Sequence, residues 1–330
     1  MVDYIGSKRW MGALGFTAVI AALTVSAPSS AEEVTLRAIS AFALDTQFGV
    51  PFKRFVDETN KRGEGIVQIQ LLGGPEAMPP AEAATALRNG VVDIAWTPPN
   101  YYENLMPEAN AIAFGNLPPA EIRKNGGWDY LNELHAEKVN AYLLTSFGWG
   151  IQHHLYLAEP IEKLDLSGLK VRPAPGMQPF FATFGASNVS MMPGEVYTAL
   201  ERNVINGYSW PMWGVTDLGW HTVTKQRIDP GYGGVQVNAI VNLDTWKKLD
   251  QPQRDFLNEM AAWFEEYAAQ TIAETSAAEA KKQADAGIKV LTLTGEEKER
   301  WTQTFSDIMW QSVAEKAPEN VEKLRGFVIR

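Results

Sequence analysis

The 330-residue chain contains no cysteine, which removes several kinds of chemistry. Without a thiol there can be no disulfide, no thiolate nucleophile and no cysteine-based metal site. Histidine is scarce as well, at four residues, and no HExxH zinc-protease spacing occurs. His153 and His154 are adjacent, so in a strand they would face opposite sides and could not hold one metal together.

Signatures of catalysis are equally sparse. The sequence has no phosphate-binding P-loop and no dinucleotide-binding glycine fingerprint. The segment from Gly207 to Pro211 begins like the nucleophile elbow of a hydrolase, but it lacks the closing glycine. We therefore expect a protein that is not an enzyme and that uses no cofactor. An exported enzyme acting on small acids is the alternative, and turnover of a bound acid would reveal it.

Positive charge and long apolar runs are also in short supply. The chain has 29 Lys and Arg against 39 Asp and Glu, a formal net charge of −10. An acidic protein does not suit nucleic acid, whose binding depends on cations that meet phosphates. Beyond the N-terminus no segment approaches the roughly 20 consecutive apolar residues that a membrane span requires.

The N-terminus has the order of a secretory signal peptide. Lys8 and Arg9 precede an apolar stretch at 10–25, and Ser29-Ser30-Ala31 offers small residues for cleavage. The stretch is short and rich in Ala, Thr and Gly, so a cleaved signal is favoured over a permanent membrane span. We therefore expect residues 1–31 to direct export to the periplasm.

Strand-like and helix-like patterns alternate along the mature chain. The sequence predicts strands at 34–39, 66–72 and 91–96 and helices at 48–60 and 80–89. Such alternation indicates an α/β fold, and about 300 residues are enough for two lobes.

One helical pattern is much longer than the others. Apolar residues recur at helical spacing over 251–286, with no Pro or Gly between Gln253 and Asp285. At 1.5 Å per residue this helix would be about 50 Å long, which exceeds one lobe. We expect it to lie across both lobes, although its polar, Ala-rich second half would also fit a solvent-exposed coil.

The sequence also repeats itself. Residues 85–93, TALRNGVVD, resemble residues 198–206, TALERNVIN, and each segment is followed by a strand that contains a Trp, Trp96 or Trp210. Two unrelated strand–helix–strand units could converge on similar sequences. The alternative is two lobes of like construction, each with strand ends at a shared cleft, where open α/β sheets bind ligands.

Arg172 is the strongest candidate for a binding residue. It ends a short apolar strand in the segment 165–173, DLSGLKVRP, and Pro173 and Pro175 then break the chain. A guanidinium fixed in this way can offer two donors to a carboxylate. Taken alone, Arg172 could equally be a surface residue in an ordinary ion pair.

The surrounding motifs resemble a known family. Segments 165–172, 184–186 (FGA) and 193–200 (PGEVYTAL), with 72–74 (LGG) and 90–95 (GVVDIA), are similar to the DctP-type solute-binding proteins of TRAP transporters. The resemblance covers essentially the whole mature chain. It implies a two-lobed periplasmic binding protein fold, a long helix spanning both lobes, TRAP membrane subunits as partners, and Arg172 as the clamp of a ligand carboxylate.

The same resemblance narrows the ligand. Members that bind sialic acid have a second Arg and an Asn-Pro where this chain has Gln152 and Trp210-Pro211, whereas keto-acid-binding members have a Gln and a Trp there. Those members also hold a metal with two Glu, and here Ser209 and the Val235-Gln236 region supply no carboxylate. A bridging cation needs anionic oxygens. We therefore expect metal-free binding of a keto, hydroxy, aromatic or sugar acid.

These observations define the expected site and lobes. We expect Arg172 to fix the carboxylate, Gln152 and Ser209 to hydrogen-bond its neighbouring oxygens, and Trp96 and Trp210 to cover the apolar part. The remaining expected ligand-binding residues are Phe48, Glu76, Tyr101, Trp149 and Gln236. Crossovers near Trp149 and Val237 would separate lobe I, 32–149 plus 238–277, from lobe II, 150–237 plus 278–330. A monomer or homodimer is expected, and a receptor for an ABC transporter or a sensor is the rival function.

Overall fold

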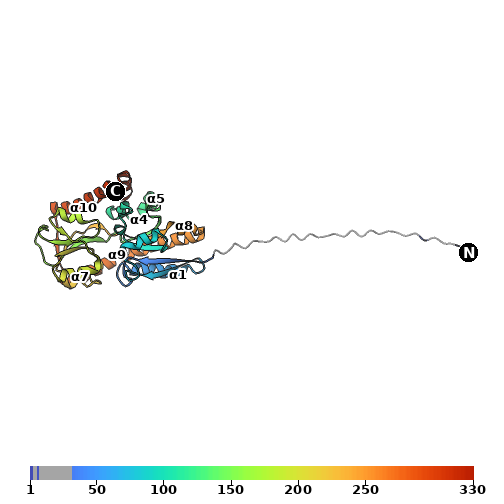
Figure 1. Ribbon diagram of the computed structural model, residues 1–330, viewed down its shortest axis with the longest axis horizontal. Coiled ribbons are helices and arrows are strands. Elements are labelled where there is room, and N and C mark those ends of the chain that lie inside the picture. Colours follow the sequence, from blue (N-terminus) through green and yellow to red (C-terminus); the bar gives the residue numbers. More distant parts are fainter. Residues whose placement is uncertain (3–5, 7–31) are drawn as a thin grey trace. The chain divides into compact units, whose positions relative to one another are not determined.

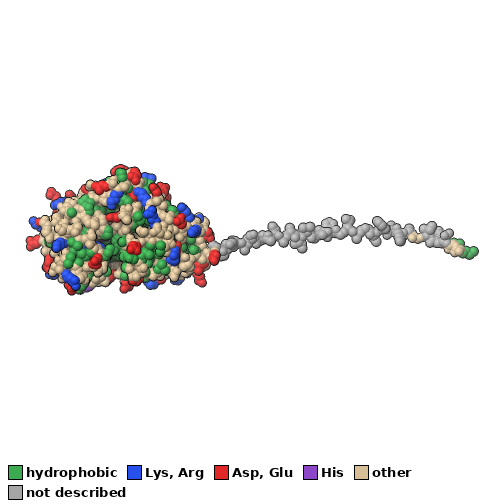
Figure 2. All heavy atoms as spheres, viewed as in Figure 1, with side chains coloured by type: hydrophobic (Ala, Val, Ile, Leu, Met, Phe, Trp, Pro, Cys, Tyr) green, Lys and Arg blue, Asp and Glu red, His purple; other side chains and the backbone are tan. Residues whose placement is uncertain are grey.

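The computed structural model describes residues 1, 2, 6 and 32–330, so almost all of the predicted signal peptide lies outside the described residues. Residues 32–330 contain two β-sheets, each flanked by helices, and form two α/β lobes (Figure 1). Within this part of the chain no helix is long and apolar enough to cross a bilayer. On the face shown in Figure 2, acidic and basic side chains are interspersed without a continuous basic stripe.

The sheet of lobe I has five strands in the order β2-β1-β3-β11-β4. β1 pairs in parallel with β2 and β3, while β11 is antiparallel to β3 and β4. Its strands are β1 Val34–Ser40, β2 Val67–Gly73, β3 Ile94–Thr97, β4 Ala141–Phe147 and β11 Val237–Asn242. The helices around it are α1 Val50–Arg62, η1 Pro80–Glu82, α2 Ala83–Arg88, η2 Pro99–Tyr101, η3 Pro107–Asn110, α3 Ala111–Phe114, α4 Pro119–Lys124, α5 Gly127–Val139 and α8 Leu243–Lys248.

The sheet of lobe II has the order β12-β9-β5-β8-β6-β7, and β10 pairs with β5 beside this path. β6 is parallel to both β7 and β8. Its strands are β5 Gln152–Leu157, β6 Lys170–Arg172, β7 Ser187–Asn188, β8 Gly207–Pro211, β9 Gln226–Asp229, β10 Tyr232–Gly234 and β12 Lys289–Thr292. The helices that follow in chain order are α6 Gln178–Thr183, α7 Pro193–Glu201, η4 Trp220–Val223, α10 Gly295–Lys316 and α11 Pro318–Val328.

The chain changes sheets between β4 and β5 and again between β10 and β11, close to the crossovers expected at Trp149 and Val237. The last helix departs from the expected boundaries. α11 buries Val321, Leu324 and Val328 in the same cluster as Leu131 of α5, so it packs on lobe I although its sequence position assigned it to lobe II. α10 carries the chain across, along the top edge of the molecule in Figure 1.

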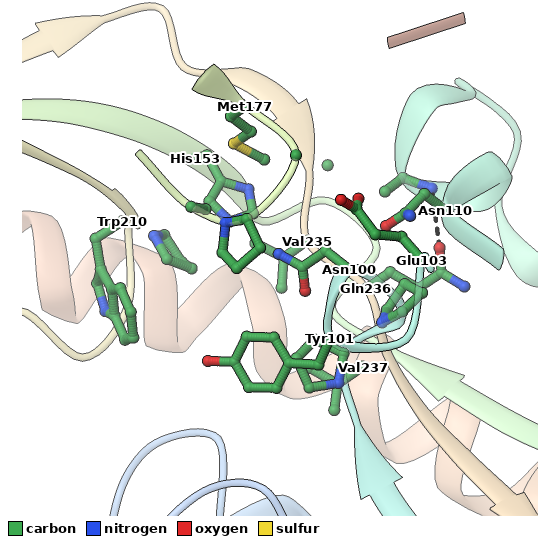
Figure 3. A pocket seen from close by; sticks show the side chains of 18 of the residues that line it. Asn100, Tyr101, Glu103, Asn110, His153, Met177, Trp210, Val235, Gln236 and Val237 are labelled. Atoms are coloured by element: carbon green, nitrogen blue, oxygen red, sulfur yellow. Dashed lines mark hydrogen bonds between the residues drawn. The ribbon is translucent and has the colours of Figure 1, made fainter. Parts of the chain in front are cut away.

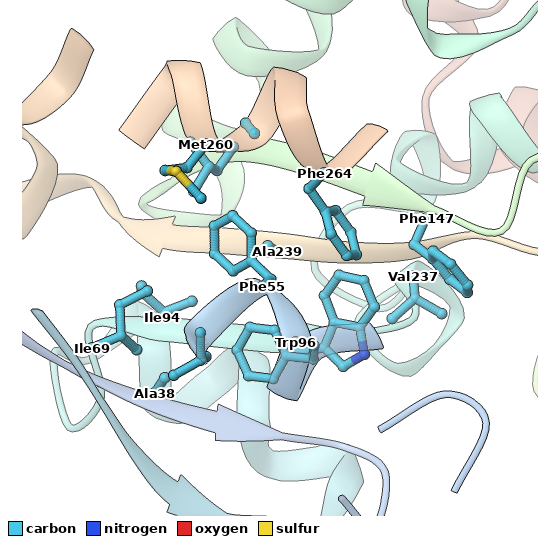
Figure 4. Packing of buried hydrophobic residues seen from close by; sticks show 14 of the residues in the cluster. Ala38, Phe55, Ile69, Ile94, Trp96, Phe147, Val237, Ala239, Met260 and Phe264 are labelled. Atoms are coloured by element: carbon cyan, nitrogen blue, oxygen red, sulfur yellow. The ribbon is translucent and has the colours of Figure 1, made fainter. Parts of the chain in front are cut away.

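The long helix α9, Gln251–Asp285, begins with a capping box, because Asp250 accepts a hydrogen bond from the Gln253 amide and the Gln253 side chain accepts one from the Asp250 amide. Its first half buries Met260 and Phe264 against the sheet of lobe I (Figure 4). In its second half, Gln283 donates to the Met212 carbonyl of lobe II at 2.8 Å. The prediction that this helix spans both lobes is confirmed.

The internal repeat corresponds to matching backbone geometry in the two lobes. Gly90 and Asn203, which align in the repeat, both adopt positive φ, +73° and +54°. The side chains of Asp93 and Asn206, which also align, accept hydrogen bonds from the amides of Arg37 on β1 and Lys170 on β6, respectively. In return, the backbone amides of Asp93 and Asn206 donate to the carbonyls of Arg37 and Lys170, respectively. The two lobes are therefore of like construction, as expected if the repeat reflects two similar lobes rather than two unrelated units.

Candidate functional site

A cavity of about 70 Å³ lies between the lobes, at the ends of β3, β6 and β8 and beside β5 and β10 (Figure 3). A cavity needs roughly 10–15 Å³ to hold one water molecule, so this one has room for a few waters or a small ligand. Its lining comes from both lobes: Phe42, Phe48, Pro98, Pro99, Asn100, Tyr101, Glu103, Asn110, Ala113, Phe114, His153, Arg172, Ala174, Pro175, Gly176, Met177, Trp210, Pro211, Gly234, Val235, Gln236, Val237 and Met309.

Arg172 is the charged centre of this cavity. It ends β6, and only 2% of its surface is exposed. Its Nε donates to the Met191 carbonyl at 3.1 Å and its Nη1 to the Ser209 carbonyl at 3.4 Å. Among residues 32–330 no carboxylate forms an ion pair with it, and burial lowers its pKa. Because a buried charge without a counter-charge is costly, this guanidinium is suited to receive an anion.

Aromatic side chains border the guanidinium. The Trp210 ring centroid lies 5.8 Å from the Arg172 Cζ, within reach of a cation–π interaction. Burial raises the pKa of the Tyr101 hydroxyl, and the positive charge of Arg172 opposes that rise. An adjoining apolar groove of about 410 Å³ shares Phe42, Phe48, Tyr101 and Trp210 with the cavity. These walls keep water from the charge and strengthen its attraction for an anion.

Five residues expected from the sequence do line the cavity. They are Arg172, Trp210, Tyr101, Phe48 and Gln236. The amide of Gln236 is used within the protein, since Oε1 accepts from the Ala113 amide at 3.1 Å and Nε2 donates to Asn238 at 3.0 Å.

Ser209 acts through its backbone. Its hydroxyl accepts a hydrogen bond from the Tyr232 hydroxyl at 2.6 Å and donates to the Met177 sulfur at 3.7 Å. The side chain is fully buried and does not line the cavity. The expectation that its hydroxyl reaches the ligand does not fit this placement. Its carbonyl instead positions Arg172, since it accepts from Nη1.

Trp96 lies in the core of lobe I, away from the cavity. Figure 4 shows its ring among the apolar side chains of this core. The ring stacks on Phe52 with 5.2 Å between the ring centroids, and the indole N–H donates to the Phe48 carbonyl at 2.8 Å. The expectation that it covers the ligand is therefore corrected. Counted from the matching Asp93 and Asn206, Trp96 corresponds to Ser209, so Trp96 and Trp210 sit one residue out of step. In a strand, one residue turns the side chain to the opposite face.

Three further expected residues also lie outside the cavity lining. Gln152 is exposed, because alternation along β5 turns His153 toward the cavity and Gln152 and His154 away from it. Trp149 is 43% exposed in the crossover. Glu76 is exposed, and its carboxylate accepts a hydrogen bond from the Gly74 amide, which lowers its pKa.

Several lining residues were not expected from the sequence. Burial lowers the pKa of His153 to about 3, so its imidazole is neutral at pH 7. Glu103 and Asn110 come from the segment between β3 and α3, and Met177 precedes α6. The only sequence signal for Glu103 and Asn110 was their position after a strand whose carboxyl end faces the cleft.

Comparison with known proteins identifies the family. Residues 40–316 match the model of the DctP family, described as bacterial extracellular solute-binding protein, family 7. A monocarboxylate 2-oxoacid-binding periplasmic protein of Nostoc is 26% identical over 219 residues, which cover 62% of this chain and 57% of that relative. The C4-dicarboxylate-binding periplasmic protein DctP of Rhodobacter capsulatus is 23% identical and covers 92% of this chain and 93% of its own length.

Solved structures agree in fold. A Bordetella pertussis extracytoplasmic solute receptor binding pyroglutamic acid has a TM-score of 0.77 at 18% identity, covering 89% of this chain and 99% of its own. A marine metagenome TRAP solute-binding protein in complex with 3-hydroxybenzoate has a TM-score of 0.73 at 19% identity, covering 90% and 98%. The family match spans most of the chain, as the motifs around Arg172 predicted, and the chain belongs to the DctP family of bacterial extracellular solute-binding proteins.

Proposed function

We propose that this protein captures a small organic carboxylate in the periplasm and delivers it to the membrane subunits of a TRAP transporter. The observation that carries the proposal is the placement of Arg172, a buried guanidinium in a cavity between two lobes, to which no carboxylate of residues 32–330 is paired. Residues 1–31 would direct export as a cleaved signal peptide.

The mechanism follows from where the cavity lies. One side of the lining comes from the segment after β3 in lobe I, which includes Tyr101. The other side comes from strand ends of lobe II, which include Arg172 and Trp210. Rotation of the lobes about the two strand crossovers would open this lining to solvent, and closure would bury the ligand. Capture needs only binding, in which the guanidinium of Arg172 holds the ligand carboxylate.

The relatives indicate the range of ligands. Their names and titles include a 2-oxoacid, a C4-dicarboxylate, pyroglutamic acid and 3-hydroxybenzoate, each an acid of modest size. A single buried guanidinium and a cavity of about 70 Å³ favour a small monocarboxylate for this chain.

A thermal-shift screen tests the proposal. The library should hold small carboxylic acids, each beside its primary amide, and calorimetry should confirm the hits. We expect acids to raise the melting temperature and the matched amides to have no effect, because the amide removes the charge that Arg172 attracts. Binding of amides as tight as that of the acids, or of none of the acids, would contradict the proposal.

The expected independence from metal has its own test. Calorimetry of an acid found by the screen, before and after the protein is treated with chelator and desalted, should give the same affinity. A large loss that Ca²⁺ or Mg²⁺ restores would show that a cation takes part.

A further inference from the structure

Both lobes contribute to the cavity lining polar groups that have no partner within residues 32–330. Lobe II contributes Arg172, whose Nη2 donates to nothing within residues 32–330, and Trp210, whose buried indole N–H also has no acceptor there. Lobe I contributes Asn100 and Glu103 from the segment after β3. The buried amide oxygen of Asn100 has no donor in the described part of the chain. Within residues 32–330 the cavity thus has a guanidinium on the side of lobe II and a carboxylate on the side of lobe I, beside groups such as the Tyr101 hydroxyl and the His153 imidazole that can donate or accept.

The Glu103 carboxylate is turned toward lobe II, over a glycine. Gly176 has a φ of +80°, and a Cβ built on it would lie 2.5 Å from Glu103 Oε2. Figure 3 shows the Glu103 side chain ending in the cavity on the side away from Trp210. Burial raises the pKa of Glu103, and the charge of Lys316 opposes that rise. A partly buried acid thus faces the same space as the guanidinium, and the absence of a side chain at residue 176 makes room for it.

The two charges do not neutralise each other directly. No ion pair within residues 32–330 joins Arg172 to Glu103, and the charged groups that act on their pKa values are other residues. Each group has lost water on burial without forming an ion pair within residues 32–330, and for Glu103 the charge of Lys316 offsets only part of that cost. A ligand with an anionic group at one end and a donor at the other would compensate both.

We propose that the ligand carries, besides its carboxylate on Arg172, a hydrogen-bond donor that binds to Glu103. The donor can be an ammonium, a ring amide N–H or a hydroxyl, so the class is amino, lactam or hydroxy acids. This inference rests on the proposed function, since that function places the carboxylate at Arg172. A 2-oxo acid offers only acceptor oxygens beyond its carboxylate, and its oxo group would meet the lone pairs of Glu103.

Pairs of acids that differ only in the donor test the inference. L-Lactate and pyruvate have the same carbon skeleton, with a hydroxyl in one and an oxo group in the other. L-Pyroglutamate and 5-oxotetrahydrofuran-2-carboxylate differ by one ring N–H. Calorimetry at pH 8 should show at least about tenfold tighter binding of the donor member in at least one pair, the penalty expected for a buried acceptor left unpaired.

Glu103→Gln separates this role from mere packing. Glutamine keeps the size of the side chain but removes its charge and can itself donate, so the preference for the donor member should fall about tenfold. Glu137→Gln, at an exposed position on α5, is the matched control and should leave the preference unchanged. An unaltered preference in Glu103→Gln, or equal binding of both members by the native protein, would overturn the inference and leave the proposed function standing.

The two proposals fail differently. If the acid that binds most tightly in the carboxylate screen has no donor besides its carboxyl group, the proposed role of Glu103 is refuted. The proposal that Arg172 binds the carboxylate is then unaffected. If no carboxylate binds at all, the proposed function fails and this inference fails with it.

Discussion

The two repeats of this protein share a scaffold but differ in their chemistry. In both, a helix ends at a residue with positive φ, and a side chain three residues later bridges to the neighbouring strand. Because Arg37 of β1 matches Lys170 of β6, the position in lobe I equivalent to Arg172 is Ile39. Ile39 is buried in an apolar cluster of lobe I, whereas Arg172 faces the cavity. The repeat therefore fixes where the strand ends lie, while the residue at each end decides which lobe presents a buried guanidinium to the cavity.

The largest effect is expected from removing the charge at one of these equivalent positions. Arg172→Met should weaken binding of the acid at least about 100-fold, because a buried anion loses its charge-assisted partner. The same variant should unfold at an equal or higher temperature without ligand, since an apolar side chain avoids the cost of an unpaired buried charge. Calorimetry and thermal unfolding measure the two effects.

Ile39→Met is the matched control for that variant. It is close to volume-conserving and should cost less than about 1.5 kcal/mol of stability with little change in affinity. Equal loss of affinity in both variants would mean that Arg172 acts through the fold rather than through the ligand.

The two tryptophans of the repeats should separate stability from binding. Trp96→Leu is expected to lower the free energy of unfolding by about 3 kcal/mol, because it opens a hole beside Phe52, and to change affinity little. Trp210→Leu should weaken binding about tenfold, since it removes a cavity wall beside the guanidinium. Denaturant unfolding and calorimetry of both variants decide this, and a large loss of affinity in Trp96→Leu would contradict the placement of that side chain.

Two glycines with the same φ test whether the position of Glu103 affects the choice of ligand. Gly176 and Gly168 both have a φ of +80°, but a Cβ at Gly168 would have nothing within 4 Å. Alanine at either position should therefore carry a similar backbone cost. Only Gly176→Ala should also displace Glu103 and reduce the preference for donor-bearing acids, severalfold by calorimetry. Identical ligand preferences in the two variants would show that the position of Glu103 does not matter.

The smallest effect is expected at the repeat turns. Gly90→Ala should cost about 1 kcal/mol, because an alanine is strained at positive φ. Asn203→Gly should change stability by less than about 0.5 kcal/mol, since glycine adopts that conformation freely. Urea unfolding of the two variants gives the comparison, and a neutral Gly90→Ala would argue against equivalent turns.

The spacing of apolar residues in the sequence predicts the helices and strands of this chain closely, but it predicts fewer of the residues that line the cavity. The long helix is found within one residue of its observed ends, because its apolar spacing and the lack of Pro and Gly are local signals. Arg172 is found from a strand end and its motif. The error at Trp96 arises because the face of a strand that a side chain takes depends on strand register, and register is set by tertiary pairing. Gln152 was expected from the resemblance, and the structure turns its neighbour His153 to the cavity instead. Glu103 follows a strand in irregular backbone, where no periodic pattern exists.

The most direct test of the central claim is a crystal structure with the tightest-binding acid from the screen. We expect a ligand carboxylate oxygen about 2.7–3.2 Å from Nη2 of Arg172, in a cavity closed by both lobes. A ligand carboxylate bound elsewhere, with this guanidinium making only its bonds to the Met191 and Ser209 carbonyls, would contradict it.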